Sequence, residues 1–192
     1  MNYTFDHPLF LWLNVDGPAP IDELMLLVST PAVWSWLYLL ILYMVWRDSG
    51  WRGVVLMLVT AAAAILLSDM IAGIFKHTGV LKHLWAEFPA RLRPMYTPEL
   101  EGMVSNVLKK GGQYGTVSAH AATMMSMAVI AIPTIGRRWF TWMMCGVVVL
   151  VCYSRIYLGY HFPMDIALGL MIGFLSGGVA YLAMRAVGQR WK

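Results

Sequence analysis

The stretch AVWSWLYLLILYMVW, residues 32–46, is almost entirely apolar, and a second apolar stretch follows it at about residues 53–75. Only a short polar segment with Arg47, Asp48 and Arg52 separates the two. About 20 apolar residues in an α-helix cross the roughly 30 Å hydrocarbon core of a bilayer. The pattern therefore predicts two transmembrane helices joined by a tight turn.

Three more apolar stretches follow, at about residues 117–135, 139–157 and 163–187. The whole chain is 59% hydrophobic and only 12% charged, which is far from the balance of a soluble protein. Near the N-terminus, residues 9–14 are short and aromatic and residues 21–29 are amphipathic, so both are expected at the membrane interface. We predict an all-α membrane bundle of about five to six transmembrane helices with an N-terminal interfacial helix.

The chain is expected to form a single membrane domain over residues 1–192, with an interfacial lead-in at residues 1–30. Its longest polar segment, residues 76–114, is too long for a plain connector and is a candidate functional region. The net charge of +4 comes from loop residues and does not indicate a nucleic-acid partner.

Basic residues in short turns indicate which side of the bundle faces the cytoplasm. One side carries Arg47, Arg52, Arg137, Arg138, Arg185, Arg190 and Lys192. The acidic N-terminus, the long polar segment and the turn around His161 fall on the opposite side. We expect that opposite side to face the periplasm.

Three polar motifs are predicted to emerge together on this periplasmic face. They are RLRP with Arg93, VSAHA with Ser118 and His120, and YSRIYLGYHFPMDIALG with Arg155, His161 and Asp165. An ionisable residue close to a membrane span is costly to keep there, so its default interpretation is functional. Their convergence on one face predicts an active site.

In the third motif, His161 and Asp165 are four residues apart and share a helix face. A carboxylate bonded to one imidazole nitrogen fixes the tautomer and leaves the other nitrogen as a nucleophile or base. The structural alternative is that Asp165 caps a helix beginning near Pro163. Arg155 could either reach the lipid headgroups or hold an oxyanion through paired N–H donors.

In the second motif, Ser118 stands at the first turn of a helix, where unpaired backbone N–H groups make an anion site. Gly115 allows the backbone to approach closely, and His120 could give a proton to a leaving group. The alternative is a serine N-cap beside an interfacial histidine. Arg91, Arg93, Lys76 and Lys82 add positive charge suited to a phosphate. No metal or Walker motif is evident, which favours metal-free chemistry through a phosphohistidine.

These motifs resemble those of the type-2 phosphatidic acid phosphatase superfamily of membrane lipid phosphatases. That family shows a lysine, six residues and Arg-Pro; then Pro-Ser-Gly-His; and finally Ser-Arg, five residues, His, three residues and Asp. SRIYLGYHFPMD matches the third motif at every position, and the second is kept as VSAH. The resemblance covers about residues 69–173.

The resemblance implies a role for each matching residue. His161 would be the nucleophile, Asp165 would orient it, and His120 would protonate the leaving group. Arg93, Ser118, Arg155 and a lysine would hold the phosphate. The first motif departs here, because the lysine position is Ala86; Lys76 is the favoured substitute and Lys82 its rival, and an apparent insertion with Trp85 and Phe88 is a candidate interfacial lid. No cofactor or metal is implied.

A site at the lipid–water boundary favours an amphiphilic substrate with a phosphate headgroup. Our first hypothesis is an undecaprenyl-diphosphatase-like enzyme of the bacterial inner membrane. The alternatives are a phosphatase of phosphatidylglycerol phosphate, phosphatidic acid or lipid A. A different class, a transporter or binding protein for anionic lipids, is less favoured because no internal repeat is evident. The exact lipid, the oligomeric state and the role of Asp69 stay open.

Overall fold

The computed structural model describes residues 4–75, 84 and 90–189 of the 192-residue chain. Within these residues the regular structure is helical, and the only β-type pairing is an isolated bridge between Leu92 and Tyr114. The predicted all-α class is confirmed. The helices are α1 (His7–Leu13), α2 (Ala19–Val28), α3 (Ser35–Phe75), α4 (Ala119–Ile135), α5 (Arg138–Tyr157) and α6 (Pro163–Gln189).

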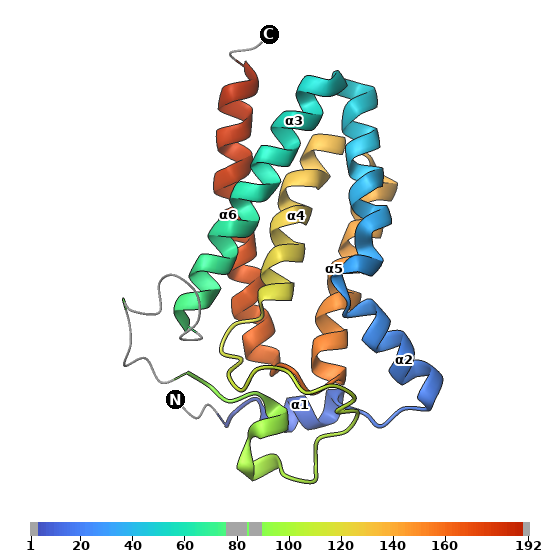
Figure 1. The fold of residues 1–192 in the computed structure, drawn as a ribbon, viewed down its shortest axis with the longest axis vertical. Helices are drawn as coiled ribbons and strands as arrows, with labels where there is room; N and C mark the ends of the chain where they lie inside the picture. Colours follow the sequence, from blue (N-terminus) through green and yellow to red (C-terminus); the bar gives the residue numbers. More distant parts are fainter. Residues whose placement is uncertain (1–3, 76–83, 85–89, 190–192) are drawn as a thin grey trace.

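The long helices run side by side along the length of the molecule, and α1 and α2 lie at one end of the bundle (Figure 1). Helix α3 contains a sharp reversal at Gly50, whose φ of 64° and ψ of −166° are not helical. Its two limbs correspond to the two apolar stretches that the sequence predicts as a hairpin. A residue other than glycine rarely adopts this φ, so Gly50 makes the tight turn possible.

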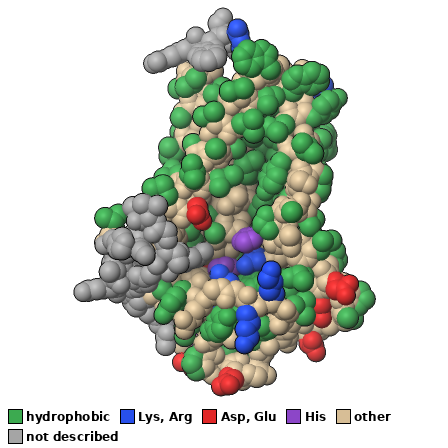
Figure 2. All heavy atoms as spheres, in the orientation of Figure 1, with side chains coloured by type: hydrophobic (Ala, Val, Ile, Leu, Met, Phe, Trp, Pro, Cys, Tyr) green, Lys and Arg blue, Asp and Glu red, His purple; other side chains and the backbone are tan. Residues whose placement is uncertain are grey.

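In the part of the chain that the structure describes, three helical segments are long and apolar enough to cross a membrane: Pro31–Ile74, Arg138–Tyr157 and Pro163–Gly188. Because the first folds back at Gly50, it supplies two limbs. Helix α4 is shorter but is packed between α3, α5 and α6. Apolar side chains cover the outer surface of the bundle (Figure 2), among them Leu39, Trp142, Val149, Phe174 and Leu182. A lipid environment explains so large an exposed apolar surface.

Helices α4 and α6 approach unusually closely through a row of glycines on α6. A Cβ at Gly169 would lie 2.5 Å from the Ser118 carbonyl oxygen, and one at Gly173 would overlap the backbone of Ala122. Small residues at four-residue spacing let helix backbones meet in this way in membranes. The close approach fixes the start of α4 against the start of α6, where the polar motifs lie.

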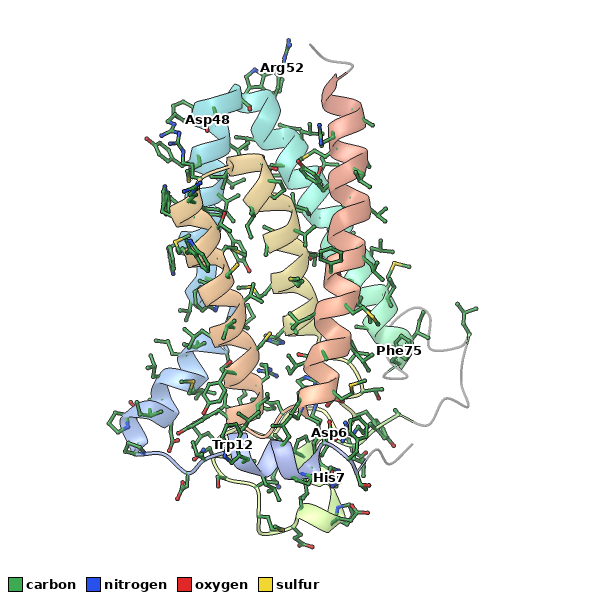
Figure 3. All side chains as sticks on the ribbon, turned by 180° about the vertical axis from the view of Figure 1, so that it is seen from behind. Asp6, His7, Trp12, Asp48, Arg52 and Phe75 are labelled. Carbon is green, nitrogen blue, oxygen red and sulfur yellow. The ribbon has the colours of Figure 1, made fainter. Side chains whose placement is uncertain are left out.

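The two ends of the bundle differ in character (Figure 3). Asp48 and Arg52 lie at the end where α3 reverses, whereas Asp6, His7 and Trp12 lie at the other end. The polar motifs lie at this second end. Asp69, whose role the sequence leaves open, is an exposed residue on α3.

Candidate active site

Backbone hydrogen bonds bring the first and second motifs together. The Arg93 N–H donates to the Gln113 carbonyl oxygen at 3.0 Å, and the Gly115 N–H donates to the Arg91 carbonyl oxygen at 2.9 Å. This short antiparallel pairing places the RLRP segment beside the glycine turn that leads into α4. Arg93 is thereby fixed next to the start of the Ser118 helix.

The second motif is joined in turn to the third. Ser118 is the N-cap of α4, and its Oγ accepts a 3.4 Å hydrogen bond from the Ala121 N–H. Its own N–H donates to the Asp165 carbonyl oxygen at 3.0 Å. The serine N-cap expected as an alternative is therefore present, at the point where α4 meets α6.

His161 is buried, and its Nδ1 faces two oxygens. The Gly115 carbonyl oxygen lies 3.0 Å away, and Asp165 Oδ2 lies 3.5 Å away. A carbonyl oxygen can only accept, so Nδ1 donates the proton here, and in the neutral imidazole Nε2 then carries the lone pair. This is the tautomer that a nucleophilic imidazole needs.

Asp165 serves both of the roles that the sequence left as alternatives. Its Oδ2 accepts the Phe162 N–H at 2.9 Å, which caps the first turn of α6. The same oxygen faces His161 Nδ1. The Asp165 carboxylate therefore both caps the start of α6 and orients the imidazole of His161.

Two guanidinium groups border the ring of Tyr160. The Cζ of Arg155 lies 4.1 Å from the ring centroid, and the Cζ of Arg93 lies 5.7 Å from it. Arg155 also donates to the Oγ of Ser29, while its buried Nε has no hydrogen-bond partner among the described residues. Adjacent guanidinium groups with spare donors make a binding site for an oxyanion.

Arg93 keeps its charge in this setting. Burial lowers the pKa of Arg93, and the nearby Tyr160 and Tyr96 oppose that effect. An arginine starts so far above neutrality that it stays protonated.

Gly115 separates Arg93 from His161. A Cβ at this position would lie 2.7 Å from Arg93 Cγ and 3.3 Å from His161 Nδ1. The glycine thus lets the cationic side chain and the imidazole approach the same point. Figure 2 shows histidine beside Lys or Arg side chains in a hollow at this end of the bundle.

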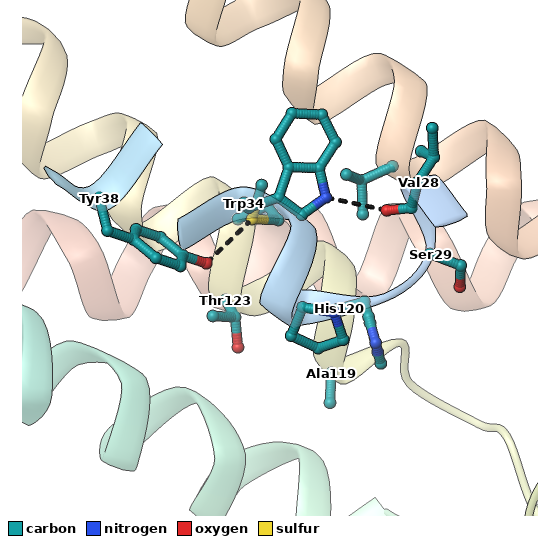
Figure 4. A pocket seen from close by; sticks show the side chains of 10 residues that line it. Val28, Ser29, Trp34, Tyr38, Ala119, His120 and Thr123 are labelled. Atoms are coloured by element: carbon teal, nitrogen blue, oxygen red, sulfur yellow. Dashed lines mark hydrogen bonds between the residues drawn. The ribbon is translucent and has the colours of Figure 1, made fainter. Parts of the chain in front are cut away.

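His120 lies in the first turn of α4 and lines a cavity of about 170 Å³ (Figure 4). The other lining residues are mostly apolar: Val28, Ser29, Pro31, Trp34, Tyr38, Ala119, Thr123, Met124 and Val151. Trp34 is fixed by a 2.8 Å hydrogen bond from its Nε1–H to the Val28 carbonyl oxygen. The cavity therefore adjoins both His120 and Ser29, the partner of Arg155.

The structure places six of the predicted site residues at one end of the bundle: Arg93, Ser118, His120, Arg155, His161 and Asp165. Lys76 and Lys82 lie outside the described residues, as do Trp85 and Phe88 of the candidate lid.

The surroundings of Arg91 differ from the expectation that its charge would serve the phosphate. Its guanidinium faces the carboxylates of Asp6 and Asp165. Asp6 and Ser29 were missed as site residues. They belong to N-terminal segments with no motif, and only the folded contacts bring them here.

Comparison with known proteins decides the family. The sequence profile of the PAP2 superfamily matches residues 53–189, which is most of the chain. The chain belongs to the PAP2 superfamily. It is thus a membrane lipid phosphatase and a phosphoric ester hydrolase, as its motifs predict.

Among curated proteins, this PAP2 chain is 29% identical to a lipid A 4'-phosphatase of Porphyromonas gingivalis, over 95% of the chain and 74% of the relative. It is 28% identical to a lipid A 4'-phosphatase of Bacteroides thetaiotaomicron, over 92% of the chain and 75% of the relative. An undecaprenyl-diphosphatase of Sulfolobus acidocaldarius is 26% identical, over 90% of the chain and 75% of the relative.

Solved structures show the same fold. LpxE of Aquifex aeolicus superposes with a TM-score of 0.69 at 19% identity, covering 93% of this chain and 96% of that one. A transmembrane PAP2-type phosphatidylglycerolphosphate phosphatase of Bacillus subtilis gives a TM-score of 0.63 at 20% identity, covering 98% and 87%. These likenesses support the membrane bundle and leave the substrate open.

Proposed function

We propose that this protein removes a phosphate group from a lipid A-type glycolipid by way of a phosphohistidine. The observation that carries the mechanism is the position of His161, whose Nδ1 faces the Gly115 carbonyl oxygen and Asp165. The substrate assignment draws on the two relatives named lipid A 4'-phosphatase. Lipid A, an alternative in the sequence analysis, thus replaces undecaprenyl diphosphate as the first candidate. Undecaprenyl diphosphate is the second candidate because of a relative with 26% identity.

In the first step, the lone pair on His161 Nε2 forms a bond to phosphorus as the bond from phosphorus to the lipid oxygen breaks. His120 gives its proton to the departing oxygen, which prevents the accumulation of an alkoxide. Arg93, Arg155 and the start of α4 at Ser118 neutralise charge on the phosphoryl oxygens. Asp165 stabilises the positive charge that appears on the imidazole.

In the second step, water attacks the phosphohistidine. His120, now neutral, accepts a proton from that water, and the bond between phosphorus and Nε2 breaks. The electron pair of that bond returns to His161, and inorganic phosphate leaves. Each histidine ends in its starting protonation state, so the catalytic cycle closes.

The cavity beside His120 suits the organic part of the substrate. Trp34, Met124 and Val151 give it apolar walls, and it borders the residue that would protonate the leaving oxygen. A phosphate held by the arginines would therefore have its leaving group at the mouth of an apolar space. This arrangement supports a lipid or glycolipid over a small soluble ester.

Phosphate release by the purified, detergent-solubilised protein tests the proposal. Lipid A, undecaprenyl diphosphate, phosphatidic acid and phosphatidylglycerol phosphate are compared side by side in EDTA. We expect the highest kcat/KM with lipid A and no inhibition by EDTA. Faster turnover of undecaprenyl diphosphate would transfer the assignment to the second candidate, and no release from any of the four would reject phosphatase function.

His161→Ala tests the mechanism in the same assay. It should lower release by about a thousandfold or more, because the covalent route disappears. Incubation with phosphate-labelled substrate followed by alkaline quenching should trap acid-labile label on the wild-type protein and none on the variant. Equal labelling of both would eliminate His161 as the nucleophile.

A further inference from the structure

Arg91, in the first motif, forms a buried ion pair with Asp6, which belongs to none of the three motifs. Arg91 Nη1 donates to Asp6 Oδ2 at 3.0 Å, and its Nη2 donates to Asp6 Oδ1 at 2.5 Å. Both residues are 3% exposed. Burying two charges is costly unless they are well paired, and a guanidinium that donates through both Nη atoms to one carboxylate meets that requirement.

This ion pair also reaches the proposed nucleophile's partner. Arg91 Nη1 lies 3.4 Å from Asp165 Oδ1, the oxygen that does not cap α6. Asp6 Oδ2 accepts the Met164 N–H at 3.2 Å. The pair therefore holds both the carboxylate of Asp165 and the backbone just before it.

Aromatic contacts fix Phe162, in the turn between His161 and the start of α6. Phe162, which directly follows His161, is fully buried. The Cζ of Arg91 lies 3.7 Å from its ring centroid, and the His7 ring stacks on it at 4.8 Å. Burial, reinforced by the charge of Arg91, lowers the pKa of His7, which disfavours a second cation beside Arg91.

The segment that carries Asp6 is firmly anchored. At the far end of α1, the Asn14 side chain donates to the Tyr157 carbonyl oxygen at 2.7 Å and accepts the Ser105 N–H at 2.7 Å. Beyond it, the Tyr157 hydroxyl donates to Asp22 Oδ1 at 2.7 Å. Asp6 therefore projects from a fixed scaffold under the bundle (Figure 3).

We propose that Asp6 and Arg91 form a positioning clamp that sets the orientation of Asp165 toward His161. The PAP2 profile begins at residue 53, so Asp6 lies outside the matched region. The inference rests on the proposed function, because the clamp acts through the nucleophile. It gives the N-terminal segment a part in catalysis without contact with the substrate.

The division of the Arg91 donors explains why Asp6 is needed. Asp6 accepts two N–H groups of the guanidinium, whereas Asp165 makes one longer contact with Nη1. Without the Asp6 charge, the guanidinium would be drawn to Asp165 as a bidentate partner. Asp165 would then turn away from His161 Nδ1 and support the imidazole less.

The first test is Asp6→Asn, with Asp16→Asn as its matched control, because Asp16 is an exposed residue of the same N-terminal segment. We expect Asp6→Asn to lower kcat by about 10- to 100-fold, by analogy with the loss of carboxylates that orient metal-ligating histidines. KM should stay within about twofold, since the phosphate-binding arginines are untouched. Asp16→Asn should match the wild type.

A comparison of a lipid substrate with a small soluble ester distinguishes the clamp from a role in lipid binding. The kcat for a small soluble ester, para-nitrophenyl phosphate, should fall by the same factor as that for the lipid. Asp6→Glu, which keeps the charge, should recover most of the kcat. An unchanged kcat in Asp6→Asn, or a loss confined to KM or to the melting temperature, would overturn the clamp.

Arg91→Lys and Arg91→Gln provide a second pair if Asp6→Asn fails to fold. The lysine keeps the positive charge between the two carboxylates, so its kcat should exceed that of the glutamine variant by about tenfold. Equal kcat values for the two would overturn the clamp. An inactive wild-type protein would instead reject the proposed function, so the two failures are distinguishable.

Discussion

Gly115 stands between Arg93 and His161, where the candidate site has no room for a side chain. Its carbonyl oxygen fixes the tautomer of His161, while its missing side chain leaves room for Arg93. Both functions depend on the position of the Gly115 backbone. A small displacement there moves the proposed nucleophile and a phosphate ligand together.

Gly115→Ala should therefore impair catalysis more than folding. The new Cβ would stand 2.7 Å from Arg93 Cγ, so the turn must shift. A misplacement of about 1 Å can cost a hundredfold in rate, and we expect a loss of kcat/KM of about 10- to 100-fold. Steady-state phosphate release measures it.

Gly112→Ala is the matched control, since a Cβ there would meet nothing within 4 Å. Its kcat/KM should stay within about twofold of the wild-type value, as expected for an exposed substitution without a new contact. Comparable losses in both variants would show that the loop as a whole, and not the Gly115 contact, limits activity.

The residues that the sequence could reveal are those with fixed spacing. His161 and Asp165 are one helical turn apart, and Ser118 and His120 open a helix, so local pattern was enough to select them. Asp6 offers no such signal, because it contacts Met164 across 158 positions of the chain. Such a pairing is created by the tertiary fold, and one sequence cannot predict it.

At the scale of helices, the row of small residues on α6 sets how closely α4 can lie. Gly169, Gly173 and Gly177 each face backbone or Cβ atoms of α4 or the residue before it. The same contact joins Ser118 to the start of α6 through the hydrogen bond to the Asp165 carbonyl oxygen. Helix packing and site geometry are therefore coupled.

Gly173→Ala should lower the melting temperature. Its Cβ would overlap the backbone of Ala122, and overpacking of this kind costs about 1–3 kcal/mol. For a chain of this size, that corresponds to a drop of roughly 2–10 °C, measurable by a thermal-shift assay in detergent.

The control on the same helix is Gly178→Ala, where a Cβ would find open space. Alanine is about 1 kcal/mol more favourable than glycine inside a helix, so this variant should melt at the wild-type temperature or slightly above it. The melting temperature should therefore change in opposite directions in the two variants, which distinguishes the effect of packing from that of helix propensity. A fall of equal size in both variants would contradict close packing at Gly173.

The sequence predicts the helix boundaries well because proline and glycine residues mark them. Pro163 begins α6, and Gly136, with a φ of 64°, ends α4, each within about two residues of the expected position. The packing partners were not predicted, because hydrophobicity all round a membrane helix does not say which face meets which neighbour. The close α4–α6 contact was missed for that reason.

At the scale of the whole molecule, the cavity beside His120 lies where α2, the start of α3, α4 and α5 meet. Its apolar walls should decide how large an organic group can leave from the phosphate. Filling the cavity while sparing the polar residues would separate the recognition of lipid from the chemical step.

Val151→Phe should narrow this cavity, since Val151 is buried on its wall. We expect kcat/KM for the lipid to fall by about tenfold, with a change within about twofold for para-nitrophenyl phosphate, whose small leaving group needs less of the space. Val149→Phe is the control, because Val149 is 67% exposed on the same helix. An equal loss with both substrates would indicate damage to the site and not to lipid recognition.

The distribution of charge along the bundle predicts its orientation in the cell. Arg47, Arg52, Arg137, Arg138 and Arg185 lie in the turn of α3, in the turn from α4 to α5 and near the end of α6, away from the candidate site. Arginine in short loops is retained in the cytoplasm. We therefore propose that the site opens to the periplasm of a bacterial inner membrane.

Reporter fusions in a bacterial host test this orientation. Green fluorescent protein joined to the C-terminus should fluoresce, and alkaline phosphatase at the same point should be inactive, because that end is expected in the cytoplasm. Alkaline phosphatase joined after Lys110, on the side of the candidate site, should be active. The reverse pattern would place the arginines of the site in the cytoplasm, where a lipid exposed only on the periplasmic leaflet could not reach His161.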